Sequence, residues 1–441
     1  MNLPDNILIV GLGASGIAAA KFLRGMGKRI AIADEKDEAA LAPVLRSLNG
    51  VEFTGHFGPH RTEDFLRYPL IVISPGVDSA LPVLKEANAK GIRVIGEVEL
   101  AYMFLDAPVI AITGTNGKTT TTTLIGEIFK KAFGSVFVGG NIGNPLINYA
   151  LEGKKAQHII AEISSFQLET VEAFRANTSI LLNITEDHLD RYRGYDEYRD
   201  AKYRIFERQT EKDYALIIDG LEAPKAGKGR VLSFSSAKVL EEGAFAKDGM
   251  LYVRIDGKEF LYERDLSPLV GAHNTENILA ALLAAHIYGI DQATVTSVLG
   301  EFKGLPHRVE LVRELKGVRY YNDSKATNVD ATKRALENIE GNVILIAGGK
   351  DKGGSYRAIA GVAQKIKVLI VIGEAQDKIT GELGSHVVIY KEEDMAGAVR
   401  AAYEVAESGD IVLLSPMCSS FDMFTDYKHR GDTYREIVES L

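Results

Sequence analysis

A glycine- and threonine-rich stretch at residues 114–120, GTNGKTT, combines the groups that bind nucleotide phosphates. Such a loop needs consecutive backbone N–H groups, a lysine, and a hydroxyl that can contact Mg²⁺. The stretch follows an apolar run and precedes a helical pattern, but Ile112 stands where the common G-x-x-x-x-G-K-[ST] spacing has its first glycine. We predict a nucleotide site on an altered loop, against the alternative of a decorative turn. Its members are Gly114, Thr115, Asn116, Gly117, Lys118, Thr119 and Thr120.

Two later residues are candidate ligands for a hard cation. Glu162 ends an apolar run, and His188 follows the next run among acidic residues. Mg²⁺ prefers carboxylate, water and phosphate oxygens, which makes Glu162 a natural ligand and His188 a less usual one. Glu162 could instead cap a helix, and His188 could be a polar loop residue.

Lys202 shares one face of a predicted helix with Tyr198, Ile205 and Phe206. A lysine on an apolar face usually extends its ammonium group to solvent. The alternative is an amine kept neutral by burial, which is nucleophilic enough to react with CO₂.

The N-terminal glycines form a second candidate phosphate site. The segment GLGASG, residues 11–16, lies between a predicted strand and a predicted helix, and Asp34 ends the next strand. This context matches a dinucleotide fingerprint and leaves NAD, another nucleotide diphosphate and a bare tight turn open. The predicted domain of about 95 residues is short for a complete dinucleotide fold, which weakens NAD. Ser74 ends a later strand at the edge of the sheet where ligands of open α/β sheets bind.

The elements that must position these residues follow an α/β pattern in three series. Apolar runs alternate with helical patterns in each series, which predicts mostly parallel sheets. Residues 211–265 differ, because their apolar runs and the Asp256-Gly257 pair predict small antiparallel hairpins. We expect three consecutive α/β domains over residues 1–97, 98–304 and 305–441. The first and last are Rossmann-like, and the central one is P-loop-type with a small antiparallel subsheet.

Composition excludes several classes of protein. The 441 residues are 46% hydrophobic and 25% charged, as in ordinary globular proteins, and the formal charge of −9 disfavours nucleic acid as a partner. The single cysteine, Cys418, excludes an intrachain disulfide and fits a reducing cytosol. No apolar stretch is long enough for a membrane span, and the N-terminus shows no signal peptide. We expect a soluble, cytoplasmic protein.

Eight motifs occur in the order seen in the Mur ligases of peptidoglycan synthesis, and the chain resembles that family across all three predicted domains. They are TGTNGKTT, AEISSFQLE, NITEDHLDRY, AKYRIF, GAHNTENILAA, GLPHRVE, YNDSKATN and SPMCSSFDMF. The chain is most similar to the members that add D-glutamate to UDP-N-acetylmuramoyl-L-alanine (UDP-MurNAc-L-Ala). In this family ATP phosphorylates a substrate carboxylate, and the amine of an amino acid then attacks the acyl phosphate. The loop without its first glycine is the family's own form.

The resemblance implies ATP and two Mg²⁺ ions, which Mn²⁺ could replace. Thr119 and Glu162 would bind magnesium, and His188 would bind the second ion together with Lys202, carbamylated by CO₂. Besides the phosphate loop, ATP would contact Asn274, Asn277, Arg308 and Asp323. The residues implied in catalysis are Lys118, His188, Lys202 and Arg308.

The resemblance also assigns both other substrates. The N-terminal domain would bind the diphosphate of the UDP substrate instead of NAD. Asp34 and Glu35 would lie near the uridine. The residues implied there are Gly13, Ala14, Ser15, Asp34, Ser74, Gly76, Asn141 and His188. The C-terminal domain would bind D-glutamate through Lys325, Thr327, Lys352, Ser420 and Tyr427. Some members of the family have other residues at Lys350 and Tyr427, and Cys418 nearby is expected to be a small buried residue.

Rival hypotheses are another Mur or folylpolyglutamate-type ligase with a different amino acid, and an NAD-dependent oxidoreductase. SPMCSSFDMF favours D-glutamate, and an oxidoreductase would leave the phosphate loop, Glu162 and Lys202 unexplained. We expect a monomer that binds small molecules, with no nucleic acid partner.

Overall fold

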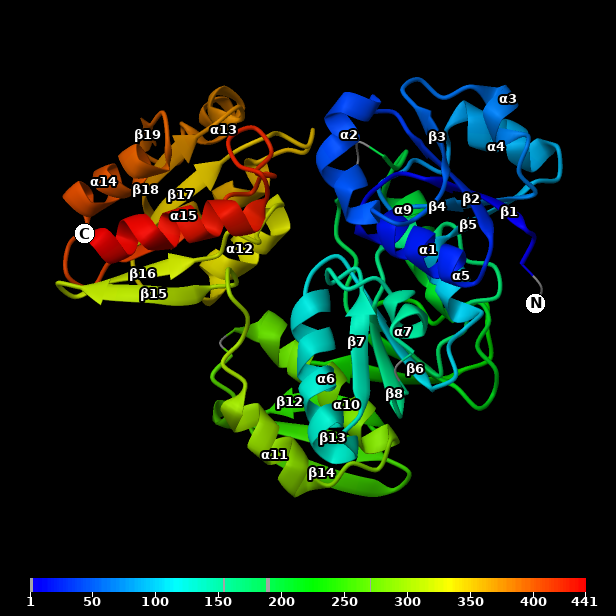
Figure 1. Ribbon diagram of the computed structural model, residues 1–441. Coiled ribbons are helices and arrows are strands. Elements are labelled where there is room, and N and C mark those ends of the chain that lie inside the picture. The colour runs from blue at the N-terminus through cyan, green and yellow to red at the C-terminus, as the bar shows by residue number, and fades with distance from the viewer. Residues whose placement is uncertain (1–2, 154, 188–190, 270) are drawn as a thin grey trace. The chain divides into compact units, whose positions relative to one another are not determined.

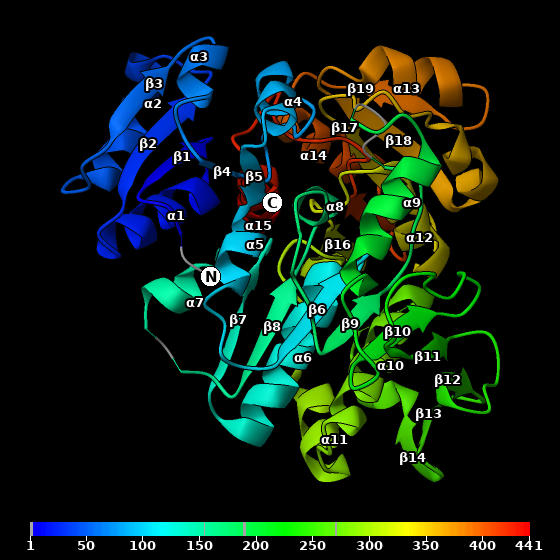
Figure 2. The same ribbon diagram turned by 90° about the vertical axis from the view of Figure 1, so that its right-hand side faces the viewer.

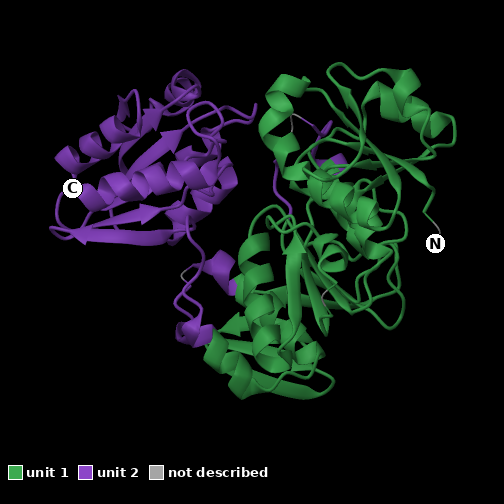
Figure 3. Ribbon diagram, viewed as in Figure 1, with its two compact units in different colours: residues 1–183, 198–263, 276–298 green, residues 184–197, 264–275, 299–441 purple. Residues whose placement is uncertain are grey.

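The computed structural model describes residues 3–153, 155–187, 191–269 and 271–441. These residues form three separate β-sheets joined in chain order (Figures 1 and 2). The α/β class with a P-loop-type central sheet and a small antiparallel part is confirmed. The chain divides into two compact units (Figure 3). Unit 1 contains residues 1–183, 198–263 and 276–298, and unit 2 contains residues 184–197, 264–275 and 299–441.

The first sheet, in unit 1, has five parallel strands in the order β3-β2-β1-β4-β5. The strands are β1 (Asn6–Val10), β2 (Arg29–Asp34), β3 (Thr54–Phe57), β4 (Leu70–Ile73) and β5 (Arg93–Gly96). The helices are α1 (Ala14–Gly25), α2 (Glu38–Leu45), α3 (Thr62–Phe65), α4 (Pro82–Ala89) and α5 (Glu97–Tyr102), with the 3₁₀ turn η1 (Arg46–Leu48). Strand order reverses between β1 and β4, and such a switch point opens a crevice at the carboxyl ends of the strands.

The turn from β1 into α1 requires glycine at two places. Gly11 has a φ of +87°, in the left-handed region that favours glycine. A Cβ on Gly16 would lie 2.0 Å from the Gly11 carbonyl oxygen. Close packing of strand and helix therefore requires glycine at positions 11 and 16, whereas a Cβ on Gly13 would meet no atom within 4 Å.

The second sheet, also in unit 1, has nine strands in the order β14-β13-β12-β11-β10-β9-β6-β8-β7. Figure 2 shows the run from β7 across to β11. The strands are β6 (Val109–Thr113), β7 (Val136–Gly140), β8 (His158–Glu162), β9 (Thr178–Leu181), β10 (Tyr214–Ile218), β11 (Arg230–Ser235), β12 (Gly243–Lys247), β13 (Met250–Ile255) and β14 (Lys258–Glu263). The central helices are α6 (Lys118–Phe133), α7 (Asn148–Leu151), α8 (Ser165–Leu168), α9 (Tyr195–Tyr203), α10 (Ala272–Ile287) and α11 (Gln292–Glu301), with η2 (Arg204–Phe206) and η3 (Arg264–Leu266).

Part of the hairpin prediction for residues 211–265 is wrong. β10 pairs in parallel with β9 and β11 pairs in parallel with β10, so both strands extend the central sheet. Within residues 211–265 the antiparallel pairs are β12–β13 and β13–β14, and β12 pairs with β11 in parallel. The turn predicted at Asp256-Gly257 joins β13 to β14, and both residues have positive φ.

The third sheet, in unit 2, has six strands in the order β15-β16-β20-β17-β18-β19. They are β15 (Glu310–Leu315), β16 (Val318–Asn322), β17 (Val343–Gly348), β18 (Ile366–Ile372), β19 (Ile389–Lys391) and β20 (Ile411–Leu414). The helices are α12 (Val329–Asn338), α13 (Gln376–Leu383), α14 (Met395–Val405) and α15 (Tyr427–Ser440), with η4 (Arg357–Lys365). α14 and α15 pack together (Figure 1), and apolar side chains are buried on both faces of this sheet. A β15–β16 hairpin precedes the parallel part.

Candidate functional site

The predicted phosphate loop lies between β6 and α6, and α6 begins at Lys118. Gly117 caps the helix with a φ of +86°, and a Cβ there would come within 2.2 Å of Asn277 Oδ1. Gly114 has a φ of +152°, and a Cβ on it would lie 3.0 Å from Leu182 Cβ. The altered loop therefore makes its turn with Gly114 in place of a residue at position 112. Its N–H groups open at the start of a 16-residue helix, where an anion is stabilised.

Lys118 and an asparagine that sequence reasoning missed hold this loop. Lys118 Nζ donates to the carbonyl oxygens of Gly114 and Thr115, each at 2.8 Å. The Asn116 N–H donates to Asn183 Oδ1 at 2.8 Å, and Asn183 Nδ2 donates to the Asn116 carbonyl at 3.0 Å. Asn183 follows β9, so its side chain fixes the loop to the neighbouring strand.

Lys202 is buried beside the same loop and does not extend to solvent. Its side chain is 1% exposed, and Nζ donates to the Gly114 carbonyl at 2.9 Å. The amine lies 4.4 Å from the centre of the Tyr198 ring. Ile205 and Phe206 are buried too, as the shared helical face predicted. Burial excludes the solvent-extended alternative for Lys202.

Glu162 lies at the carboxyl end of β8, one strand from the phosphate loop. Ser164 caps α8, so the alternative of Glu162 as a helix cap is wrong. Glu162 is 2% exposed, and Oε1 accepts from Asn141 Nδ2 at 3.0 Å. Its Oε2 atom is buried without a hydrogen-bond partner among the described residues. An orphaned carboxylate oxygen fits a hard cation.

His188, the predicted ligand of a second metal ion, lies outside the described residues. Within those residues no group of three or more His, Cys, Asp or Glu side chains is arranged to hold a metal. Thr119 lies in the first turn of α6, and Thr120 is buried behind it.

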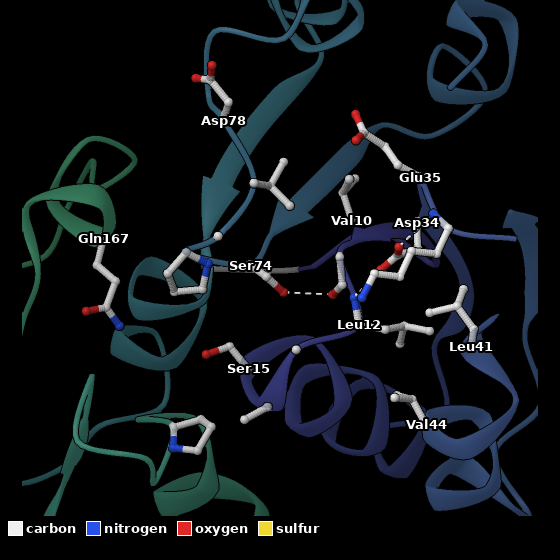
Figure 4. Close-up of a pocket in the computed structure, with 18 of the residues that line it drawn as sticks. Val10, Leu12, Ser15, Asp34, Glu35, Leu41, Val44, Ser74, Asp78 and Gln167 are labelled. Atoms are coloured by element: carbon white, nitrogen blue, oxygen red, sulfur yellow. Dashed lines mark hydrogen bonds between the residues drawn. The ribbon is translucent and has the colours of Figure 1, made fainter. Parts of the chain in front are cut away.

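A cavity of about 650 Å³ opens at the switch point of the first sheet (Figure 4). Every described residue implied for the UDP substrate lines it: Gly13, Ala14, Ser15, Asp34, Ser74, Gly76 and Asn141. Glu35 lines it as well, and Gln167 of α8 faces it from the central part of unit 1 (Figure 4).

Backbone hydrogen bonds hold the walls of this cavity. The Leu12 N–H donates to Asp34 Oδ2 at 2.9 Å, and the Lys36 N–H donates to Asp34 Oδ1 at 3.1 Å. Ser74 Oγ donates to the Gly11 carbonyl at 2.7 Å (Figure 4). Asp34 thus shapes the glycine loop besides lining the cavity, and its carboxylate oxygens already accept backbone N–H groups.

Unit 2 contains a second cavity, of about 720 Å³. All five residues implied for D-glutamate line it: Lys325, Thr327, Lys352, Ser420 and Tyr427. Lys350 is a third lysine in this lining, and Lys325 Nζ lies 3.8 Å from the centre of the Tyr427 ring. Lys352 Nζ is 3.9 Å from Asp187 Oδ1. Such a cluster of cations suits a small dianion.

The two acidic residues of the same lining are already engaged. Asp351 accepts from Lys378 Nζ at 2.7 Å and from the Tyr356 hydroxyl at 2.8 Å. The Lys378 hydrogen bond helps to lower the pKa of Asp351, against the opposing effect of burial, which is the largest. Asp426 accepts from the His429 N–H and caps α15. The lysines therefore dominate the charge that the cavity offers a ligand.

Arg430, which was not predicted from the sequence, forms hydrogen bonds with two loops next to this cavity. It is 1% exposed and donates to Ser324 Oγ at 3.0 Å and to the carbonyl oxygens of Cys418 and Ser419. It thereby joins the loop before Lys325 to the loop before Ser420. Burial lowers the pKa of Arg430 to about 10, which leaves it charged at neutral pH. Cys418 is buried as expected, and burial raises the pKa of its thiol to about 11.

The remaining residues implied for ATP are placed unit by unit. In unit 1, Asn277 accepts from Thr121 Oγ1 of α6 at 3.1 Å. In unit 2, Asn274 lies in the first turn of α10, and Arg308 is half-buried. Asp323 is buried, which raises its pKa to about 7, and it accepts from Ser415 Oγ at 2.8 Å. A simple surface turn therefore does not describe Asp323.

Cations surround the start of α10 within unit 2. The pKa of His273 falls to about 4, first because of burial and then because of Arg334, Arg308 and Arg264. A neutral imidazole beside several guanidinium groups indicates a locally positive surface, which suits phosphate.

The fold and the site define a multidomain α/β protein with a phosphate loop and separate substrate cavities. The Mur ligase middle domain matches residues 112–285, the MurD-like N-terminal domain of Mur ligases matches residues 5–96, and the Mur ligase glutamate ligase domain matches residues 307–418. The chain belongs to the Mur ligase family.

Relatives and solved structures agree with this family. The chain is 46% identical to the UDP-N-acetylmuramoylalanine--D-glutamate ligase of Geotalea uraniireducens, over 100% of this chain and 98% of the relative. It is 42% identical to the ligase of the same name from Caldanaerobacter subterraneus, over 99% of this chain and 98% of the relative. The structure of the MurC ligase of Thermotoga maritima has the same fold, with a TM-score of 0.60, 20% identity and 99% of both chains covered. Among the described residues, no helix has the length and apolarity to cross a membrane.

Proposed function

We propose that this chain is the ATP-dependent ligase that joins D-glutamate to UDP-MurNAc-L-Ala through an acyl phosphate. The observation that carries the proposal is the gathering of the implied residues into two cavities, one in each unit. Relatives that are 42% and 46% identical over nearly the whole chain are named as ligases of this type, which supports the choice of D-glutamate.

The first chemical step transfers the γ-phosphoryl group. A carboxylate oxygen of UDP-MurNAc-L-Ala attacks the γ-phosphorus of ATP, the P–O bond to ADP breaks, and an acyl phosphate forms. Lys118 and the N–H groups at the start of α6 would neutralise the transferring phosphoryl group. Lys118 Nζ donates to the Gly114 and Thr115 carbonyls, which places the amine at the loop, where it would exchange these acceptors for phosphate oxygens.

The second step forms the amide bond. The D-glutamate amine attacks the acyl carbon, loses a proton, and displaces inorganic phosphate. The two carboxylates of D-glutamate would pair with Lys325, Lys350 and Lys352, while Ser420 donates a hydroxyl. Holding both carboxylates fixes the direction of the amine.

Two further parts of the proposal concern the metal. Thr119 and Glu162 would hold Mg²⁺, and the orphaned Oε2 atom of Glu162 supports this role. When bound, the cation supplies charge neutralisation between the γ-phosphate and the attacking carboxylate. Lys202, buried beside Gly114, would react with CO₂ to give a carbamate and release a proton, which turns a cation into an oxygen ligand. His188 would share this second ion.

We further propose a cytoplasmic monomer. The single cysteine, which is buried and free, supports a reducing compartment.

The test is phosphate release with ATP, Mg²⁺ and UDP-MurNAc-L-Ala against a panel of amino acids. We expect turnover with D-glutamate and little with L-glutamate, L-alanine or a diamino acid. Turnover with one of these others and none with D-glutamate would overturn the assignment.

A further inference from the structure

A short helix at the end of the first sheet carries two buried glutamates. α5 begins directly after β5, and its residues Glu97 and Glu99 are 2% and 0% exposed. Buried carboxylates are expensive unless they are hydrogen-bonded, so both require partners. Each finds them on a different segment of the central part of unit 1.

Glu97 holds the segment that follows β7. Its Oε1 atom accepts from the Ile147 N–H at 2.6 Å, and the Leu146 N–H also contributes to its pKa. This segment, residues 140–147, lines the UDP cavity through Gly140, Asn141, Gly143 and Pro145. Its other end is fixed at Glu162, because the Asn141 N–H donates to the Glu162 carbonyl at 2.8 Å. The Glu97 side chain therefore holds the end of the segment that is opposite to Glu162.

Glu99 holds a different segment. Its carboxylate accepts from the N–H groups of Glu172, Ala173 and Phe174, at 2.8 to 3.0 Å. None of these three residues lines the UDP cavity. Glu99 therefore matches Glu97 in type, helix and burial, but does not support the cavity wall.

We propose that Glu97 is a positioning residue for the UDP-sugar substrate, acting through residues 140–147. This inference rests on the function proposed above. The segment carries Asn141 and Pro145 into the cavity, and its backbone after Gly143 is held by the Glu97 side chain. The second carboxylate oxygen, Oε2, is buried without a partner among the described residues. Burial raises the pKa of Glu97 to about 7, which favours the neutral acid.

The experiment compares the affinity for UDP-MurNAc-L-Ala and for ATP, by calorimetry, in the full chain and three variants. Glu97→Ala should weaken UDP-MurNAc-L-Ala about tenfold, because a buried hydrogen bond that fixes the wall is lost, and leave ATP within about twofold. Glu97→Gln keeps the acceptor and should restore wild-type affinity. Glu99→Ala, the matched control, should lower the melting temperature without changing the affinity for UDP-MurNAc-L-Ala.

Wild-type affinity in Glu97→Ala would overturn the proposal, as would an equal loss in Glu99→Ala. If Glu97→Ala does not fold, Glu97→Asp decides, because it keeps the carboxyl group but withdraws the acceptor by one methylene group. Unchanged affinity in that variant would also overturn the proposal. Turnover of the wild-type chain with D-glutamate is measured in parallel. Its absence would refute the proposed function, whereas turnover with unchanged affinity in the variants would refute the role of Glu97 alone.

Discussion

At the scale of single residues, the chemistry depends on side chains that the fold removes from solvent. Lys202, Glu162 and Asp323 are each at most 6% exposed, and all belong to types that are rarely buried without a reason. Lys202 Nζ donates to the Gly114 carbonyl, and one oxygen of Glu162 accepts from the Asn141 amide. The other Glu162 oxygen is buried without a hydrogen-bond partner among the described residues, which poises it for a ligand.

Lys202 gives a direct prediction. Lys202→Ala should lower kcat by at least about 100-fold, since it removes a group that would contribute to metal binding. Short-chain carboxylic acids should restore part of the activity by occupying the space of the carbamate, and bicarbonate should restore none. Steady-state phosphate release measures both. Lys225→Ala, at a side chain that is 89% exposed, serves as the control and should have wild-type activity. Full activity in Lys202→Ala would refute the role.

We expect Glu97 to make a pH-dependent contribution to the free energy of unfolding. Its pKa is raised from 4.5 to about 7 in the folded chain by burial. The neutral form is therefore favoured by folding, and this contribution is complete below pH 4.5 and is lost as the pH rises through 7. Glu97→Gln removes it. Relative to wild type, the variant should gain up to about 3 kcal/mol in free energy of unfolding between pH 4.5 and 8. Urea denaturation at both pH values measures the difference, and a constant difference would show that Glu97 does not titrate on unfolding.

At the scale of elements, the phosphate loop depends on the strand beside it. The Asn183 side chain forms reciprocal hydrogen bonds with the backbone of Asn116, whereas Asn177, at the opposite end of β9, accepts from the Val109 N–H at 3.0 Å. Asn183→Ala should raise the KM for ATP about tenfold, because the loop loses its brace. Asn177→Ala removes a similar bond at the far end and should leave this KM unchanged. Equal KM values in both variants would show that the brace does not organise the loop.

The sequence predicted elements well where a buried apolar run identifies a strand. β1, β2, β4 and β5 of the first sheet each coincide with an apolar run, whereas β3 gives no such signal, because its sequence TGHF has no apolar run and it lies at the edge of the sheet. β10 and β11 were identified as strands but given the wrong pairing. Direction of pairing depends on which strand is the neighbour, and an apolar run does not contain that information.

In the candidate site, too, features that are local in the sequence could be predicted, and features that depend on tertiary contacts could not. The phosphate loop is contiguous in sequence, so its composition was enough to predict it. Asn183 and Glu97 each hold a backbone N–H group that is 50 or more positions away in the sequence. Arg430 donates hydrogen bonds to two separate loops. Nothing in their local sequence distinguishes them from an ordinary strand end, a helix start and a surface arginine. Only the tertiary structure shows which backbone groups they hold.

At the scale of the whole molecule, each substrate cavity belongs to one compact unit. Of the described residues, those that line the UDP cavity all belong to unit 1, and those that line the lysine-rich cavity all belong to unit 2. A ligand that binds one unit stabilises that unit by mass action, and the local hydrogen bonds of its cavity should then open less often. The order in which segments become protected should therefore follow the order in which ligands are added.

Hydrogen–deuterium exchange read by mass spectrometry tests this arrangement. UDP-MurNAc-L-Ala alone should slow exchange in residues 10–16 and 140–147, while residues 350–353 and 419–427 exchange as in the free chain. D-glutamate, added last in the presence of ADP and UDP-MurNAc-L-Ala, should slow the second pair without further change in the first, because the described residues that line its cavity belong to unit 2. Protection of residues 419–427 by UDP-MurNAc-L-Ala alone would show that the first substrate also orders the amino acid cavity, and the two cavities would then be coupled instead of independent.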